Sequence, residues 1–328
     1  MTRGRGEIGI DSGAGSVEAL LAGAEFRHRR KRSHAPGHGK QPHAPRRVRR
    51  GSSVAALATP TSRPISHPVS LAVGRLRTLG AMAELAGACL GAMARPTRAR
   101  RRELIRQSAV ILRSAMPAAM LSIAAWGFAG PGLQAGNFLV TFGSIDRSGG
   151  FMVVAIVREF GTYVTATVVA GVVGTMFTAE LGARRVRGEL DALSVLGVDP
   201  VKDLIAPRVL ALILTMLGLD LFALVFGVLG GYLATTLVLG GTEGAFMASF
   251  FANTTPADVI ASLVKVGIFG ALIGVICAYH GLNVTGGPAG VGRAVNRAIV
   301  GCLIAIFVVN LIYTQWFLAS FPSVGVFK

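Results

Sequence analysis

The chain has 328 residues, of which 52% are hydrophobic and 15% charged, and its mean hydropathy is +0.58. Several apolar runs exceed the roughly 20 residues that a helix needs to cross a bilayer, which excludes a soluble globular protein. The net charge of +17 does not indicate a nucleic-acid-binding protein, because most Lys and Arg precede Ser114 or lie in two loops between apolar runs, as in cytoplasmic segments of membrane proteins. The cysteines Cys89, Cys277 and Cys302 lack paired spacing, so neither a disulfide framework nor a zinc site is predicted.

The amino-terminal residues, 1–68, are rich in Arg, His, Pro, Gly and Ser and carry the basic runs RHRRKR at 27–32 and RRVRR at 46–50. This composition predicts a disordered basic tail in the cytoplasm. The apolar patch at 54–58 is shorter than a signal-peptide core, so no cleaved secretion signal is predicted. The tail is either a solvated extension, a misassigned start of the chain, or a segment that binds anionic lipid or nucleic acid.

Residues 69–94 predict an amphipathic helix, and Arg75, Arg77 and Glu84 lie outside its apolar face. Because a basic stretch follows at 95–102, we expect the helix to lie on the inner membrane surface, where apolar burial and anionic headgroups act together. The alternative is a cytosolic helix that packs against the membrane bundle. The predicted apolar face consists of Ala72, Leu76, Leu79, Ala83, Ala86, Leu90 and Met93.

An all-α, polytopic membrane fold follows this interfacial helix. An odd number of spans after a cytoplasmic amino terminus places the carboxyl terminus outside, and the basic residues of the loops near 184–208 and 293–297 agree with that topology. The five predicted transmembrane helices cover residues 107–142, 150–182, 207–240, 258–281 and 294–320.

The first span contains Pro117 and the glycine-rich stretch WGFAGPGLQAG at 126–136, which together predict an interruption of the helix. Backbone that is broken at membrane depth must be buried in protein or face a cavity. We therefore expect the interruption to lie inside the bundle.

Small residues recur every four positions in three of the spans. Such stripes let helix backbones approach closely, either within one chain or between subunits of an oligomer. The stripes consist of Ala166, Ala170, Gly174, Thr178 and Gly182 in the second span, Gly227 and Gly231 in the third, and Gly270, Gly274 and Ala278 in the fourth.

A charged island at 184–208 separates the second span from the third and predicts two short cytoplasmic helices at an elbow. Gly197 suits the end of the first helix, while Asp199 and Pro200 suit the cap and first residue of the second. A polar loop gains nothing by keeping a hydrophobic stripe unless a partner covers it, so we expect the elbow to dock onto another protein. The stripe consists of Val186, Leu190, Leu193, Leu196 and Gly197.

No catalytic constellation is recognisable, and His280 is the only histidine outside the amino-terminal region. The glycine-rich sequence GGPAGVGR at 286–293 lacks the GxxxxGK[ST] pattern of a phosphate-binding loop and is expected to be a connection into the fifth span. We therefore predict that the chain is not an enzyme and binds no cofactor or metal of its own.

Ionisable residues inside the spans are costly unless they are paired or hydrated. Arg158 and Glu159 cannot share one helix face, because neighbours on a helix lie about 100° apart, so each needs its own partner. The charges either form ion pairs that fix helix register or line a polar path for a substrate headgroup. Glu180 lies four residues before Arg184 and predicts a local ion pair. The charged span residues are Arg158, Glu159, Glu180, Asp220 and Lys265.

These features resemble the MlaE/YrbE permeases, the membrane subunits of MCE-type lipid-transport ABC systems, and most closely the actinobacterial YrbE branch. The resemblance covers residues 69–317, within a permease domain of 69–328, and the tail has no counterpart in the family. Phe160 and Thr162 replace the Leu and Pro that are common after Arg-Glu in the family, which changes the shape of that part of the cavity. The matching sequences are VREFGTYVTATVVAGVVGTMFTAELGARRVRGELDALSVLGVDPVKDLIAPR at 157–208, Lys265, and YHGLNVTGGPAGVGRAVNRAIV at 279–300.

The resemblance implies a permease subunit of an ATP-driven transporter for phospholipid, fatty or mycolic acid, or sterol in the plasma (inner) membrane. The implied partners are a cytoplasmic ABC ATPase that holds ATP and Mg, a second permease subunit in a homodimer or a YrbE-paralogue heterodimer, and extracytoplasmic MCE proteins. The residues implied to couple to the ATPase are Glu189, Asp191, Leu193, Leu196, Gly197, Asp199 and Pro200. The candidate residues for an intramembrane lipid path are Arg158, Glu159, Lys265 and Gln134.

Two other functional classes fit the same spans. A secondary transporter or channel would use Arg158, Glu159 and Lys265 as an ion path and would work without a partner ATPase. A noncatalytic membrane scaffold would support an extracytoplasmic assembly and would not depend on the span charges.

Overall fold

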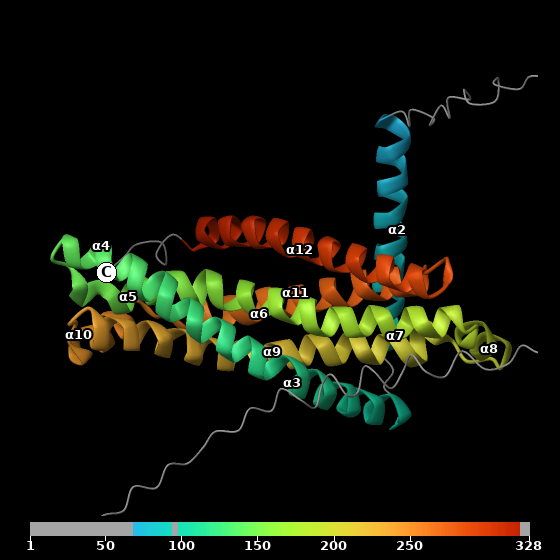
Figure 1. Cartoon of the computed structure of the whole chain (residues 1–328), viewed down its shortest axis with the longest axis horizontal. Helices are drawn as coiled ribbons and strands as arrows, with labels where there is room; N and C mark the ends of the chain where they lie inside the picture. The colour runs from blue at the N-terminus through green and yellow to red at the C-terminus, as the bar shows by residue number, and fades with distance from the viewer. Residues whose placement is uncertain (1–67, 94–97, 322–328) are drawn as a thin grey trace, which may run out of the picture. The chain divides into compact units, whose positions relative to one another are not determined.

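Long helical segments lie alongside one another in the bundle (Figure 1). The computed structural model describes residues 68–93 and 98–321, and every regular element in these ranges is helical. This confirms the predicted all-α fold with five membrane-spanning helices, while the predicted tail at 1–68 falls almost entirely outside the described residues. The spans are Arg100–Thr141, Ile145–Val186, Val201–Val238, Pro256–Leu282 and Gly287–Ser320.

Most spans contain several helical elements, because short 3-10 or π-helical segments, labelled η, alternate with α-helix. The first span includes α3 (Arg98–Gly127), η1 (Phe128–Ala135) and α4 (Gly136–Thr141). The second includes η2 (Ile145–Arg147), α5 (Ser148–Met152), η3 (Val153–Phe160), α6 (Gly161–Val169), η4 (Ala170–Gly174) and α7 (Thr175–Val186). After α8 (Glu189–Val195), the third includes η5 (Val201–Ile205), α9 (Ala206–Leu233) and η6 (Ala234–Val238). After α10 (Glu243–Asn253), α11 (Pro256–Leu282) and α12 (Gly287–Ser320) form the last two.

The predicted interruption of the first span is wrong. Pro117 lies inside α3, and the glycine-rich stretch continues as helix through η1, whose π-helical turns accommodate the second proline. The glycines are needed for close packing on α9, since a Cβ atom added to Gly127 would lie 2.1 Å from the carbonyl oxygen of Gly227. Glycine at membrane depth therefore marks a helix crossing here, not a break.

The small-residue stripes pack within the chain. Ala166 and Ala170 are fully buried, and a Cβ atom on Gly174 would lie 3.0 Å from the sulfur of Cys277 in α11. On α11 itself, a Cβ atom on Gly270 would lie 3.0 Å from the Cα atom of Ile213 in α9. Of the two predicted uses of these stripes, the structure therefore shows the intrachain one.

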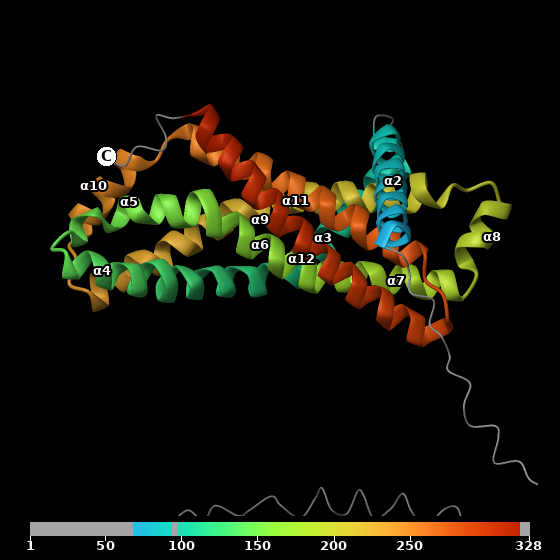
Figure 2. The same cartoon turned by 90° about the horizontal axis from the view of Figure 1, so that it is seen from above.

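Helix α2 (Pro68–Met93) crosses the long helices and packs against α9 and α11 (Figures 1 and 2). The predicted apolar face is not the face that packs on the bundle: Leu79 and Leu90 are 62% and 64% exposed. Cys89 and Ala92 are buried instead, and Met82 and Leu85 pack partly against the core. The exposed leucines are compatible with a position of α2 on the membrane surface, which stays a prediction.

Helix α10, which the sequence analysis did not identify, joins the third span to the fourth. Thr242 caps it by accepting a hydrogen bond from the backbone N–H of Ala245 at 3.4 Å. Phe246 packs against the ring of Tyr232, with ring centroids 5.4 Å apart. Helices α10 and α5 lie at the end of the bundle opposite α8 (Figures 1 and 2), so α10 closes that end between two spans.

Candidate functional site

A cavity of about 320 Å³ lies between the second, fourth and fifth spans. Four charged residues line it: Arg158 and Glu159 from η3, and Asp258 and Lys265 from α11. The remaining wall is mostly apolar and comes from η3, α11 and α12. Its members are Val154, Ala261, Ser262, Tyr313, Thr314, Phe317 and Leu318.

Arg158 pairs with Asp258, whose side chain is fully buried. The Nε of Arg158 donates to Oδ1 of Asp258 at 2.9 Å, while Oδ2 accepts from the backbone N–H of Thr255 at 2.9 Å and from its hydroxyl at 2.8 Å. Asp258 therefore caps α11 and neutralises Arg158 at the same time. The sequence analysis did not select Asp258 as a site residue, because its capping position resembles an ordinary loop.

Lys265 binds three oxygens across the cavity. Its ammonium donates to the backbone carbonyl of Arg158 at 2.9 Å, to the hydroxyl of Thr314 at 3.1 Å and to Oε2 of Glu159 at 3.4 Å. The same Glu159 oxygen accepts from the side-chain amide of Asn310 at 2.8 Å. Lys265 is almost completely buried, whereas 28% of the Glu159 side chain is exposed. Glu159 is thus the more accessible member of its pair.

The structure brings together three of the four candidate lipid-path residues: Arg158, Glu159 and Lys265. Gln134 does not join them, because it is exposed on η1 and is not part of the cavity wall. The adjacent Arg158 and Glu159 each have a separate partner, as their helical spacing predicted. We call Arg158, Glu159, Asp258 and Lys265 the cavity network.

Asp220 of α9 is fully buried, and neither of its carboxylate oxygens accepts a hydrogen bond from the described residues. It does not line the cavity. Burial of a polar group without a partner is costly, so Asp220 does not lower the free energy of this folded structure.

The elbow, residues 187–200, joins the second and third spans and contains α8. Gly188 and Gly197 flank the helix with φ angles of 73° and 77°, a left-handed conformation that favours glycine. Asp199 accepts hydrogen bonds from the backbone N–H groups of Val201 at 2.9 Å and Lys202 at 3.3 Å. The chain therefore turns at both ends of α8 and enters η5 through an aspartate cap.

The elbow exposes only part of the apolar stripe expected from spacing, since Val186 and Leu196 are exposed and Leu190 is not. Leu190 is only 4% exposed, because it packs inward, whereas Val195 and Leu196 are 88% and 77% exposed. The apolar surface thus lies at the end of α8, and Val195, which the periodicity analysis did not select, is part of it. Exposed apolar side chains of this size beside a membrane bundle indicate a contact surface.

The acidic residues of α8 already have basic partners in the chain. Arg187 donates to Glu189 at 2.6 Å and lowers the pKa of that carboxyl, and Arg185 donates to Asp191 at 2.5 Å. Lys202 likewise lowers the pKa of the Asp199 carboxyl through a hydrogen bond at 2.9 Å. Ionic contact with a partner protein would therefore compete with existing ion pairs, so the apolar surface is the more available part of the elbow.

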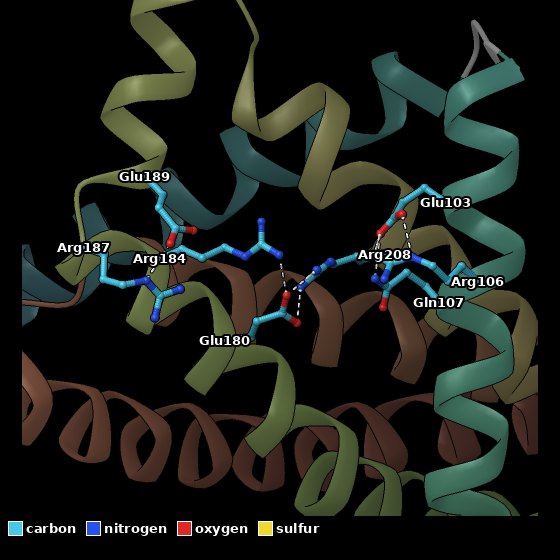
Figure 3. A network of polar contacts seen from close by, with 8 residues as sticks. All are labelled: Glu103, Arg106, Gln107, Glu180, Arg184, Arg187, Glu189 and Arg208. Carbon is cyan, nitrogen blue, oxygen red and sulfur yellow. Dashed lines mark hydrogen bonds and ion pairs between the residues drawn. The ribbon is translucent and has the colours of Figure 1, made fainter.

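A second charged network, which we call the clasp, lies where the elbow meets the spans and consists of Glu180, Arg184 and Arg208 (Figure 3). Arg184 donates to Oε1 of Glu180 at 2.8 Å, which confirms the predicted local ion pair. Arg208 donates to Oε1 at 2.7 Å and to Oε2 at 2.8 Å. Sequence spacing gave no signal for Arg208, because it lies on another span.

Comparison with known proteins decides the family. The model of the permease MlaE family matches residues 104–316. The chain belongs to the MlaE permease family. The matched region includes the cavity network, the elbow and the clasp, but not α2.

Several relatives of this MlaE-family chain are named as ABC transporter permeases. A "Probable ABC transporter permease protein" of Rickettsia felis is 40% identical over 166 residues, which cover 51% of this chain and 64% of that protein. A protein of Synechocystis with the same description is 35% identical over 224 residues, or 67% of this chain and 82% of that protein. "Protein TRIGALACTOSYLDIACYLGLYCEROL 1, chloroplastic" of Arabidopsis thaliana is 36% identical over 174 residues, or 53% of this chain and 50% of that protein.

Membership in the MlaE permease family, together with five helices long and apolar enough to cross a membrane among the described residues, indicates a multi-pass membrane protein. The aligned part of the chain spans less than two thirds of the Rickettsia felis relative. Substrate and assembly therefore have to be argued from the geometry of the site.

Proposed function

We propose that this permease moves a membrane lipid, driven by ATP hydrolysis on a cytoplasmic ABC ATPase. The observation that carries the proposal is the cavity of about 320 Å³ between three spans, in which two cations and two carboxylates face a mostly apolar wall. Apolar walls with a few convergent polar groups are typical of sites for small amphiphilic ligands.

The cavity network suits a lipid headgroup because its charges can exchange partners. Glu159 is the accessible member, and its contact with Lys265 is the longest in the network at 3.4 Å. An anionic or zwitterionic headgroup that binds Lys265 would leave Glu159 with its hydrogen bond from Asn310. Acyl chains would then lie along Val154, Phe317 and Leu318. Charged groups inside a membrane are retained mainly where they serve such a path.

The relatives support a lipid cargo at the level of class. The Arabidopsis relative is named after a galactolipid, and the family membership fits phospholipid, fatty or mycolic acid, or sterol. The cavity network contains two cations and two carboxylates, so it does not require a ligand of one particular charge. The proposal therefore extends to lipids with a small polar headgroup in general.

The proposed assembly contains two permease subunits, identical or paralogous, with an ATPase on the cytoplasmic side and MCE proteins outside. The elbow faces the ATPase, and the apolar end formed by Val195 and Leu196 supplies the main contact. ATP and Mg are held by the ATPase. In this arrangement the permease is in the plasma membrane, with its amino terminus inside and its carboxyl terminus outside.

The elbow contact can be tested by changing Leu196 to Asp in the complex purified from cells that express the partner genes. We expect loss of the ATPase from the complex and loss of lipid-stimulated ATP hydrolysis, because a charge replaces an exposed apolar contact. Ser194→Asp is the matched control, since it adds the same charge two residues earlier, inside α8, and removes no apolar side chain. Unchanged ATPase association in Leu196→Asp would refute this docking surface.

The lipid cargo is tested separately. Mass spectrometry of the purified wild-type complex should detect a retained lipid of one class, and the amount should fall when Lys265 is changed to Met. Transport that follows an ion gradient without ATP would instead support a secondary transporter. Lipid flux that is unchanged in Lys265→Met would support a scaffold.

A further inference from the structure

One carboxylate joins the two span ends between which the elbow lies. Glu180 and Arg184 precede the elbow on α7, and Arg208 follows it on α9. Oε1 of Glu180 accepts from both arginines, and Oε2 accepts a second hydrogen bond from Arg208, so the pair with Arg208 is bidentate (Figure 3). Bidentate arginine–carboxylate pairs fix orientation as well as distance.

The environment of Arg208 makes this contact hard to release. The residue is 4% exposed, its guanidinium carbon lies 5.7 Å from the ring centroid of Phe177, and its Nε has no hydrogen-bond partner among the described residues. Without Glu180, the guanidinium would be a buried cation that lacks its bidentate partner, which is strongly unfavourable. Glu103 of α3, held by Arg106 and Gln107, adds a second negative charge that acts on Arg208 (Figure 3).

The clasp has no room for a ligand. The space beside Glu180 and Arg208 amounts to about 20 Å³ and is lined by side chains that include Ile111, Phe177 and Leu212, while 40% of the Glu180 side chain is exposed. A lipid headgroup cannot enter such a volume, so the charges of the clasp serve the contact between α7 and α9 itself.

We propose that Glu180 is a positioning residue that locks the end of α7 to the start of α9, so that the elbow moves both spans together when the ATPase moves. This inference rests on the proposed coupling of the elbow to an ATPase. Without the clasp, movement of the ATPase would push the two ends of the elbow apart. The displacement of α8 would then not be transmitted to the spans that line the cavity. ATP hydrolysis would continue while less lipid moved per ATP.

The direct test is Glu180→Gln in the reconstituted complex, with Glu84→Gln on the exposed side of α2 as the matched control. We expect normal ATPase association and near-normal basal ATP hydrolysis, with the amount of lipid moved per ATP reduced at least about fivefold, the lower end of typical coupling effects. Glu84→Gln should keep the wild-type ratio. A merely structural role would lower the yield of complex and reduce hydrolysis and transport in proportion, leaving the ratio unchanged, and that result would overturn the proposal.

A second measurement reads the mechanical step without lipid. Spin labels at the exposed positions Arg187 and Lys202 report the distance between the start of the elbow and the segment that directly follows it. We expect the distance distribution to stay narrow with and without a nonhydrolysable ATP analogue in the wild type and to broaden in Glu180→Gln. An unchanged distribution in Glu180→Gln would contradict the proposal even if transport fell.

Two further outcomes separate possible failures. If Glu180→Gln does not assemble, Arg184→Gln leaves the bidentate pair intact, and a smaller loss of the lipid-to-ATP ratio is expected; an unchanged ratio would count against the clasp. If the wild-type complex moves no lipid but the label distances still broaden in Glu180→Gln, the clasp stands and the lipid proposal fails.

Discussion

The cavity network and the clasp contain the same chemistry, buried cations bound to carboxylates across helices, but differ in the space beside them. About 320 Å³ is open next to Lys265 and Glu159, whereas about 20 Å³ is open next to Arg208 and Glu180. The comparison shows that a charged residue inside a span does not by itself mark a transport path. The volume around the pair separates a site that can exchange partners from one that can only hold two helices together.

Removal of the lysine from the cavity network should have the largest effect. Lys265→Met leaves Glu159 without a cation, and breaking a buried ion pair costs about 3 kcal/mol in the free energy of unfolding. Denaturation in mixed micelles measures this loss, and lipid retention should fall in parallel. Lys202→Met removes an exposed pair with Asp199 and should change stability far less. Equal effects of the two variants would show that Lys265 is not part of a buried network.

A shorter cation in the clasp should lower stability without emptying the cavity. Arg208→Lys keeps the charge but cannot make the bidentate contact, so we expect a loss of about 2 kcal/mol in the free energy of unfolding. Lipid retained by the purified complex should stay at the wild-type level. Loss of lipid in this variant would break the distinction between the two networks.

Filling the cavity should lower lipid retention and leave stability nearly unchanged. Ala261→Phe places a ring into the open volume beside Lys265, so we expect less retained lipid while the free energy of unfolding changes by less than about 1 kcal/mol. A matched substitution on the exposed surface of the same helix, Ile260→Phe, should leave both quantities unchanged. Normal lipid retention in Ala261→Phe would show that cargo binds elsewhere.

The exposed elbow provides the smallest effect. Lys202 lowers the pKa of the Asp199 carboxyl, so its stabilising contribution is present above the pKa of the unfolded chain and is lost as pH falls through the lower folded value. The contribution should be below about 1 kcal/mol because the group is largely solvated. Asp199→Asn should reduce the acid dependence of the stability of the elbow, measured by hydrogen exchange at Val201. If stability at the elbow depended on acid as strongly as stability at the buried ion pairs, the distinction between exposed and buried pairs would be contradicted.

Hydropathy and charge bias were sufficient to predict the five spans and the position of the elbow. The sequence also indicated that Arg158 and Glu159 need separate partners and that Glu180 pairs with Arg184. It did not identify Asp258, Asn310 or Arg208 as the partners, because partner choice across helices depends on helix rotation. Periodicity within one segment contains no information about the rotation of its neighbour.

The error in the first span has a physical cause. The glycines at 126–136 were interpreted as a break, although glycine also permits the close crossing that the structure shows at Gly127 and Gly227. In α2, Cys89 and Ala92 are buried while Leu79 and Leu90 of the predicted apolar face stay exposed, which is compatible with the predicted position of this helix on the membrane surface. In a membrane protein, size decides packing where lipid and protein are equally apolar.

The most direct test of the division between the two networks is quantitative mass spectrometry of the lipid retained by three purified complexes. We expect wild type and Glu180→Gln to retain the same lipid in equal amounts, and Lys265→Met to lose most of it. Loss of lipid in Glu180→Gln, or full retention in Lys265→Met, would contradict the assignment of cargo binding to the cavity network and of coupling to the clasp.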